Sequence, residues 1–209
     1  MAIATKMLQF MEKSSWIRRM FEEGARLKQI HGAENVFDFS LGNPNVPPPE
    51  AVHKKLAEIV NRCRPGMHAY MPNAGLAELR CAVSDQMSRE HCVSLGSDNI
   101  IATCGAAGAL NIIFKALLDP HDEVLVPSPY FVEYGFYADN HGGVLKTVPT
   151  RADFTLDLER MAAAMGPRTK VVLINSPNNP TGQIYSAESL QQLGRLLDDK
   201  SRQYGRPVY

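Results

Sequence analysis

The stretch Lys170-Val-Val-Leu-Ile-Asn-Ser-Pro-Asn-Asn-Pro-Thr-Gly182 decides the fold of this chain. Its apolar run, residues 171–174, has the length and the β-branched content of a buried strand. The turn that follows holds three Asn and two Pro, so it presents side-chain amides at the carboxyl end of that strand. In open α/β sheets, ligands bind at that edge. The stretch therefore predicts a buried strand that ends at a ligand site, and a purely structural turn is an equal alternative.

The composition of the 209 residues is that of an ordinary globular protein. Hydrophobic residues make up 44% and charged residues 21%, and 22 Lys and Arg balance 22 Asp and Glu. This balance provides no basic stripe for nucleic acid. The uncharged run at residues 100–114 is shorter than the roughly 20 residues that cross a bilayer. Charges at Lys6, Glu12 and Lys13 interrupt any signal peptide. We expect a soluble, cytoplasmic protein without membrane or nucleic-acid partners.

The cysteine pattern predicts neither a disulfide framework nor a metal site. None of the four cysteines forms a CxxC pair, and their spacing matches no zinc ribbon. The one close pair of possible ligands, His91 and Cys92, is too small a set for a metal. Free, reduced thiols are expected at Cys63, Cys81, Cys92 and Cys104.

The first third of the chain has a less regular pattern than the rest. Residues 16–30 predict an amphipathic helix that is capped by Ser14 or Ser15 and is followed by Gly32. Residues 36–41 alternate like a strand. The loop 42–49 contains four prolines and is the expected domain boundary or crossover. Periodicity then predicts helices over residues 50–62 and 76–91.

The remaining sequence alternates strands with helices, which predicts βαβ units, a mostly parallel sheet and an α/β fold of three layers, an α/β/α sandwich. The last residues, 205–209, resemble a helix stop followed by the first residues of a strand, so we expect the chain to be cut inside its fold. The expected strands are 99–103, 123–126, 144–148 and 171–174, and the expected helices are 106–118, 131–140, 158–165 with Asp157 as cap, and 187–204 with Ser186 as cap.

Three strand-to-helix connections in this region could carry chemistry. Small residues in Thr103-Cys-Gly-Ala-Ala-Gly-Ala-Leu110 let backbone N–H groups approach a phosphate at a helix N-terminus, although tight helix–sheet packing explains them equally well. The segment Val126-Pro-Ser-Pro-Tyr-Phe-Val-Glu-Tyr134 offers aromatic rings, and Phe131 taken alone is more simply a core residue. The turn at 175–182 is the third. Because all three follow strands of one parallel sheet, they converge on one edge and predict a pocket for a flat, phosphorylated, polar ring.

The order and wording of these motifs resemble the class I/II aminotransferases, which are pyridoxal-phosphate enzymes of fold type I. The resemblance extends from about Phe37 to the end of the chain. The motifs that carry it are Ser40-Leu-Gly-Asn-Pro44, Tyr70-Met-Pro-Asn-Ala-Gly-Leu-Ala-Glu-Leu-Arg80, Gly105-Ala-Ala-Gly-Ala-Leu110, Asp119-Pro-His-Asp-Glu-Val124, Pro127-Ser-Pro-Tyr-Phe131 and Asn175-Ser-Pro-Asn-Asn-Pro-Thr-Gly182.

The resemblance implies a cofactor site for pyridoxal 5'-phosphate. Gly105, Ala106 and Ala107 stand where the family holds the cofactor phosphate by backbone amides. This chain has Ala where many relatives carry a hydroxyl or Lys side chain. Phe131 stands where the family stacks an aromatic on the pyridine ring. Asn179 stands where the family donates a hydrogen bond to the phenolic oxygen of the ring.

The resemblance also implies a homodimer and a domain organisation. Tyr70 corresponds to the tyrosine that reaches the cofactor phosphate of the neighbouring subunit, and Gly42 to the backbone beside the substrate carboxylate. Residues 1–49 would form an N-terminal arm and a small-domain segment, and residues 50–209 an incomplete large cofactor-binding domain. The family bends its chain at two prolines, so cis peptide bonds are expected before Pro129 and Pro180.

Two groups that pyridoxal chemistry requires are missing from this chain: a Schiff-base Lys and an acid beside the pyridinium nitrogen. In the family both follow the next strand, beyond Tyr209. Lys115, Lys146 and Lys170 are better explained as surface or helix-end charges. The resemblance thus implies no catalytic residue within these residues, and the chain by itself is expected not to transaminate.

The full-length protein is expected to transfer an amino group between an amino acid and a 2-oxo acid, in amino acid metabolism or biosynthesis. A carbon–sulfur lyase or a decarboxylase of the same fold type would share every cradle residue. A non-catalytic ligand-sensing domain of a transcriptional regulator is a further alternative, but residues 1–35 are too short for a winged-helix domain. A dinucleotide-binding domain is disfavoured because no GxGxxG follows any expected strand.

Overall fold

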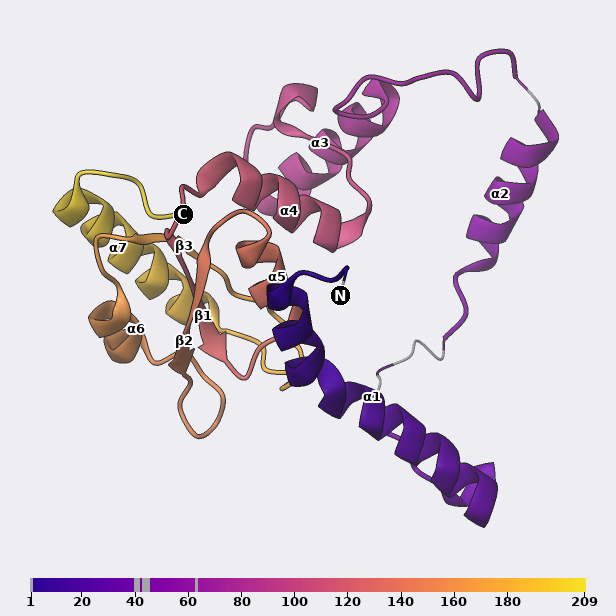
Figure 1. Ribbon diagram of the computed structural model, residues 1–209. Coiled ribbons are helices and arrows are strands. Elements are labelled where there is room, and N and C mark those ends of the chain that lie inside the picture. Colours follow the sequence, from indigo (N-terminus) through magenta and orange to yellow (C-terminus); the bar gives the residue numbers. More distant parts are fainter. Residues whose placement is uncertain (1, 40–41, 43–45, 63) are drawn as a thin grey trace. The chain divides into compact units, whose positions relative to one another are not determined.

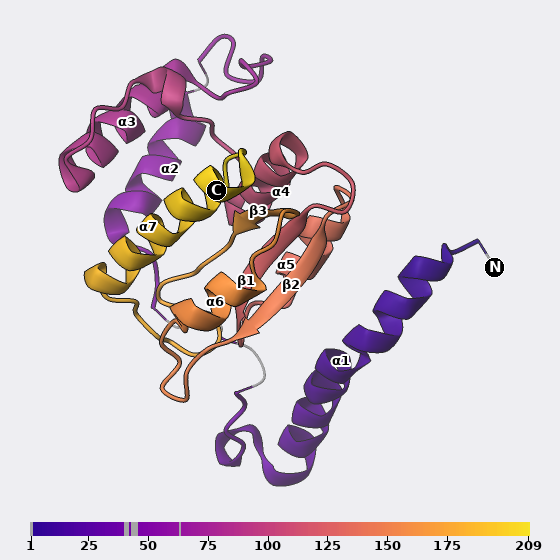
Figure 2. The same ribbon diagram turned by 90° about the vertical axis from the view of Figure 1, so that its left-hand side faces the viewer.

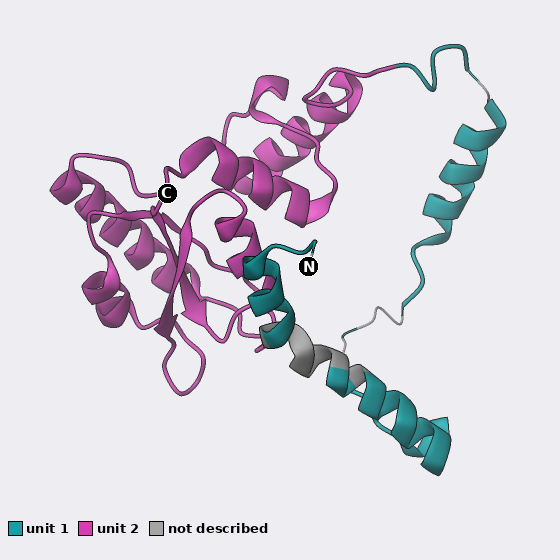
Figure 3. Cartoon of the chain, viewed as in Figure 1, with its two compact units in different colours: residues 1–69 teal, residues 70–209 magenta. Residues whose placement is uncertain are grey.

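The computed structural model describes residues 2–39, 42, 46–62 and 64–209, and for residues 13–18 and 21 it describes the backbone alone. The chain divides into two compact units, residues 1–69 and 70–209 (Figure 3). The domain boundary expected at residue 49 concerns the larger family fold and stays a prediction.

The first unit consists mainly of two helices, α1 (Thr5–His31) and α2 (Glu50–Arg62). The predicted start of α1 at residue 16 is wrong. The backbone is already helical from Thr5, and Ala4 is the N-cap without a side-chain bond. A serine inside a helix costs little, so neither Ser14 nor Ser15 ends it. The end was predicted correctly, because Gly32 adopts a φ of +85° and its N–H bonds to Lys28 O.

The strand predicted over residues 36–41 is not observed in its described part, residues 36–39, and residues 40–41 lie outside the described residues. The short 3-10 helix η1 (Ala33–Asn35) precedes it. Alternation of apolar residues favours a strand, but a strand also needs a hydrogen-bonded neighbour. Residues 36–39 form no ladder with any other described segment.

The second unit is the predicted α/β domain (Figure 1). Its three strands form one parallel sheet in the order β2-β1-β3. In chain order its elements are α3 (Ala77–His91), η2 (Ser97–Asn99), α4 (Gly105–Leu117), β1 (Glu123–Ser128), α5 (Glu133–Asp139), β2 (Val144–Pro149), α6 (Leu158–Ala164), β3 (Thr169–Val172) and α7 (Ala187–Tyr204).

The strand predicted over residues 99–103 is also not observed. Residue 99 ends η2, and residues 100–103 join no ladder. Ile100 has extended dihedrals, but the N–H of Ala102 bonds to Ala74 O in the preceding loop instead of to a strand. On the outer edge of β3, the backbone of Tyr209 makes two hydrogen bonds, to Lys170 O and from Val172 N. This is the hydrogen-bond pattern of a parallel neighbour.

Helices cover both faces of the sheet, which confirms the three-layer prediction (Figure 2). Right-handed crossovers explain the arrangement. The chain moves from β1 to β2 on one side and then back past β1 to β3, so α5 and α6 must lie on opposite faces. The helix α7 continues in the same direction as α6 and shares its face.

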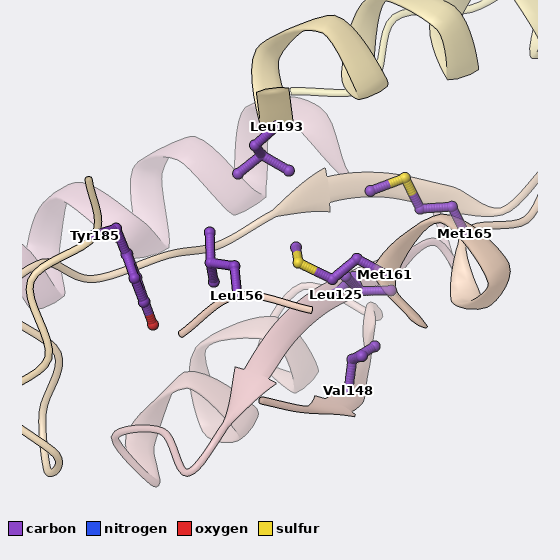
Figure 4. Close-up of a cluster of buried hydrophobic side chains, with 7 residues drawn as sticks. All are labelled: Leu125, Val148, Leu156, Met161, Met165, Tyr185 and Leu193. Atoms are coloured by element: carbon purple, nitrogen blue, oxygen red, sulfur yellow. The ribbon is translucent and has the colours of Figure 1, made fainter. Parts of the chain in front are cut away.

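The core divides in the same way. Val124 and Leu125 are adjacent in β1, so their side chains point to opposite faces of the sheet. Both are fully buried because helices cover both faces. Leu125 belongs to the cluster under α6 and α7 (Figure 4), which consists of Leu125, Val148, Leu156, Met161, Met165, Tyr185 and Leu193. Val124 belongs to the cluster under α4 and α5, with Phe114, Ala138 and Val171.

Candidate functional site

The carboxyl ends of β1 and β3 mark the point where the chain parts to the two faces of the sheet. These strands are parallel neighbours, yet the chain leaves β1 toward α5 on one face and β3 toward α7 on the other. Where adjacent connections part in this way, the strand ends are the usual ligand position in open α/β sheets. Two of the three segments singled out in the sequence, the loop with Phe131 and the turn at 175–182, meet here.

Side chains of the turn at 175–182 hold its own backbone in place. Asn175 Oδ1 accepts from Asn179 N at 2.8 Å, Ser176 Oγ from Tyr185 N at 3.0 Å, and Thr181 Oγ1 from Gln183 N at 3.2 Å. These bonds explain why so many short polar side chains occur in one turn.

The predicted cis peptide bonds are confirmed at Ser128–Pro129 and Asn179–Pro180. A third cis bond, Ser176–Pro177, was not predicted. Two of the three cis bonds thus lie in the turn and the other in the loop that faces it.

Asn178 joins the two segments, and sequence reasoning missed it. The residue is 7% exposed, and its Nδ2 donates to Pro129 O at 3.1 Å and to Thr181 Oγ1 at 3.0 Å. The sequence offered two adjacent asparagines and no local signal to show which one points back into the protein. The structure shows that Asn178 points inward and that Asn179 is exposed.

Phe131 and Asn179 remain available for a ligand. Phe131 is half-buried and packs edge-on against Tyr134, with ring centroids 5.6 Å apart. Burial raises the pKa of the Tyr134 phenol, so this supporting ring stays neutral. The side-chain amide of Asn179 has no hydrogen-bond partner within the part of the chain that the structure describes, and only its backbone N–H is bonded.

The start of α4 has the form of an anion site. Gly105 has a φ of +68°, a conformation that glycine adopts without strain, and the space where a Cβ would stand is empty to 4 Å. No side chain caps the helix, and Ala106 and Ala107 are exposed. The first N–H groups of a helix have no partner within it. The Gly105 N–H, however, donates to Thr103 O at 3.0 Å, so the amides of Ala106 and Ala107 are the ones that fit a phosphate. No hydrogen bond among the described residues joins this helix start to Phe131 or Asn179.

No hydrogen bond among the described residues joins either of the other two predicted site residues, Tyr70 and Gly42, to this group. Tyr70, at the start of the second unit, is fully exposed. Gly42 belongs to the first unit and is exposed, and no described atom lies within 4 Å of the point where its Cβ would stand. Its neighbours in the motif, residues 40–41 and 43–44, lie outside the described residues.

The lysines of the second unit have local roles, as predicted for three of them. Lys146 Nζ lies 3.2 Å from Glu123 Oε2, and Lys170 Nζ lies 5.4 Å from the centre of the Tyr209 ring. Lys115 is an exposed cation in the last turn of α4, where it complements the helix dipole.

A separate hollow of about 510 Å³ lies between residues 151–159 and residues 183–192. Its lining mixes Arg151 with the acidic side chains of Asp153, Glu159 and Glu188. It includes none of the residues that the sequence predicts to bind the cofactor. Within the described ranges, no cluster of three His, Cys, Asp or Glu side chains could hold a metal. None of the described helices has the length and apolar character to cross a membrane.

Comparison with known proteins identifies the family. Residues 34–202 match the model of aminotransferase class I and II. The chain is 41% identical over 159 residues to the aspartate/prephenate aminotransferase of Thermus thermophilus, covering 75% of this chain and 40% of that protein. It is 37% identical over 188 residues to the aspartate aminotransferase of Thermotoga maritima, covering 88% of this chain and 49% of that protein. The chain thus spans less than half the length of these curated relatives.

Solved structures give the same result for the fold. An aminotransferase from Eubacterium rectale matches with a TM-score of 0.93 and 37% identity, over 99% of this chain and 53% of that chain. The aspartate aminotransferase of Thermus thermophilus with maleate matches with a TM-score of 0.79 and 34% identity, over 95% of this chain and 51% of that chain.

Proposed function

The chain belongs to the class I and II aminotransferases, and from this premise we propose that the full-length protein transfers an amino group between an amino acid and a 2-oxo acid with pyridoxal 5'-phosphate as cofactor. One observation within the chain carries the proposal. An available aromatic face, Phe131, and an unpartnered amide, Asn179, follow neighbouring parallel strands and are joined through Asn178.

The cofactor would supply an electron sink for bonds at the α-carbon of the amino acid. The residues of this chain would bind and orient it. The N–H groups of Ala106 and Ala107 would hold its phosphate at the positive end of α4, and Gly105, which has no Cβ, would leave room for it. Phe131 would cover one face of the ring and exclude water there. Asn179 would donate its free amide hydrogen to the phenolic oxygen, which fixes the rotation of the ring.

Two further residues complete the proposal. Gly42 would bring its backbone beside the substrate carboxylate. Tyr70, whose side chain is fully exposed, would reach the cofactor phosphate of a second subunit in a homodimer. We place the lysine that binds the cofactor and the acid at the pyridine nitrogen outside these 209 residues, since the curated relatives are more than twice as long as the matched part. Free thiols at Cys81, Cys92 and Cys104 support the proposed cytoplasmic location.

The names of the relatives suggest the substrates for the first assay. Aspartate and prephenate occur in the names of curated relatives, and an alanine aminotransferase from Pyrococcus furiosus is a structural match. The full-length protein, loaded with pyridoxal phosphate, is mixed with aspartate or alanine as donor and 2-oxoglutarate as acceptor. The proposal predicts equimolar glutamate and the 2-oxo acid of the donor. Release of carbon dioxide, or cleavage of a carbon–sulfur bond in a sulfur amino acid, without amino transfer would contradict it.

A further inference from the structure

We infer that Asn178 is a positioning residue, one that holds Asn179 and the Phe131 loop at the separation the cofactor ring requires. This inference rests on the proposed function, because it concerns the same site. It assigns a role to a side chain that would not itself touch the cofactor.

The reason such a residue is needed lies in the sheet. The pairing of β1 with β3 ends at Leu125 and Val172, and the last backbone bond between the two segments runs from Leu173 N to Leu125 O at 2.8 Å. Beyond that bond the two segments diverge toward opposite faces of the sheet. Phe131 lies six residues past Leu125, and Asn179 six residues past Leu173. The ladder therefore does not fix the distance between them.

Asn178 supplies the missing link. Its Nδ2 donates to Pro129 O at 3.1 Å across a separation of 49 residues in sequence. In the described part of the chain, no other hydrogen bond connects residues 128–132 with the turn at 175–182. The acceptor belongs to the residue two positions before Phe131, so the bond acts on the backbone that carries this ring.

The backbone of Asn178 is fixed as firmly as its side chain. Its N–H donates to Gln183 O at 2.8 Å, and its C=O accepts from Gly182 N at 2.7 Å. Asn179 follows directly, and its own N–H is held by Asn175 Oδ1 at 2.8 Å. Because both the backbone and the side chain of Asn178 are hydrogen-bonded, the position of Pro129 closely determines the position of Asn179. The side chain is buried, so water cannot readily replace the bond.

Substitutions can separate this role from general support of the turn. Asn178→Asp keeps the size of the side chain but places a carboxylate, which has no hydrogen to donate, against the carbonyl of Pro129. Asn178→His restores a donor, because the δ1 nitrogen of histidine is attached at the same branch point as Nδ2 of asparagine. Thr181→Val removes the other acceptor of Asn178 and the bond to Gln183 N, both within the turn, and leaves the link to Pro129.

The test uses the full-length protein and pyridoxal 5'-phosphate, with two measurements. The first is the dissociation constant, and the second is the visible circular dichroism of the bound cofactor, which reports the asymmetry of its surroundings. We expect N178D to bind about tenfold more weakly, as for the loss of one buried hydrogen bond, and to lose most of the dichroism. N178H and T181V should remain close to the unchanged protein in both measurements.

Each other result overturns the inference. N178D with unchanged affinity and dichroism would show that the link does not position the site. T181V with a loss equal to that of N178D would show that only the stability of the turn matters. If N178D does not fold, Asn178→Ala replaces it in the comparison with N178H, and equal values for these two variants contradict the inference. Absence of cofactor binding by the unchanged protein is a different outcome, which overturns the proposed function itself.

Discussion

Thr169, the first residue of β3, should contribute more stability through its hydroxyl than through its methyl group. The residue is fully buried, and its Oγ1 donates to Glu123 Oε2 at 2.9 Å and accepts from Gly166 N at 2.9 Å. The same carboxylate lies 3.2 Å from Lys146 Nζ. Because Glu123 begins β1 and Lys146 belongs to β2, this one carboxylate connects all three strands near their amino ends.

The magnitude follows from these contacts. Thr169→Val keeps the shape and removes both hydrogen bonds. A bond to a charged group contributes about 1.5–3 kcal/mol and a neutral one about 1 kcal/mol. The Glu123 side chain is 22% exposed and keeps Lys146, so water and the ammonium compensate for part of the loss. We therefore expect Thr169→Val to lower the free energy of unfolding by about 2–3 kcal/mol, which is less than the two contributions would give without this compensation. Thr169→Ser keeps both bonds and should cost about 1 kcal/mol for the lost methyl group.

Amide hydrogen exchange in the full-length protein measures this locally. The N–H of Leu173, which bonds to Leu125 O just past β3, reports opening of the strand. Exchange at this site should become about 30- to 150-fold faster in T169V, since 1.4 kcal/mol is a factor of ten. T169S should show about a fivefold change. Equal acceleration in the two variants would refute the account, because the hydroxyl network would then not be the source of the stability.

Two more predictions concern the packing of the core and the loss of stability at high pH. Leu125→Ala, at a fully buried site, should lower the free energy of unfolding by about 3 kcal/mol, whereas Leu190→Ala, at a site 38% exposed in α7, should cost far less. Denaturant midpoints of the two variants give the comparison, and similar midpoints would contradict the packing. The hydrogen bond to Glu133, with burial, raises the pKa of Tyr137 to about 12. This phenol ionises near pH 10 when unfolded, so its contribution is complete below pH 10 and is lost as the pH rises toward 12. Tyr137→Phe should flatten that part of the stability profile, measured as the unfolding midpoint between pH 8 and 12, and an unchanged slope would argue against the bond.

Sequence reasoning worked best where structure is decided locally. The bounds of α7 were predicted to the residue, because Ser186 caps its first turn and Gly205 adopts a left-handed conformation at its end. The parallel sheet and its covering helices followed from the alternation of strand and helix patterns. Two strand predictions failed, at residues 99–103 and at residues 36–39, the described part of the predicted strand 36–41. Both segments have strand-like composition, but they lack the hydrogen-bond partners that a strand needs and that no local pattern specifies.

The candidate site shows the same division. The residue types that would contact a cofactor were found from motifs and their order, and Phe131 and Asn179 lie where two adjacent parallel strands end. The role of Asn178 could not be predicted, because it depends on a contact between residues 49 positions apart. The third cis peptide bond, at Ser176–Pro177, likewise has no signal that distinguishes it from the two that were expected.

The measurement that tests the central claim most directly is a titration of the full-length protein and its Asn179→Ala variant with pyridoxal 5'-phosphate, followed by visible absorbance. If the turn at 175–182 forms a wall of the cofactor site, the variant should bind about tenfold more weakly. Its absorbance maximum should also move, because the phenolic oxygen loses its donor. Identical affinity and an identical spectrum in the two proteins would contradict the claim.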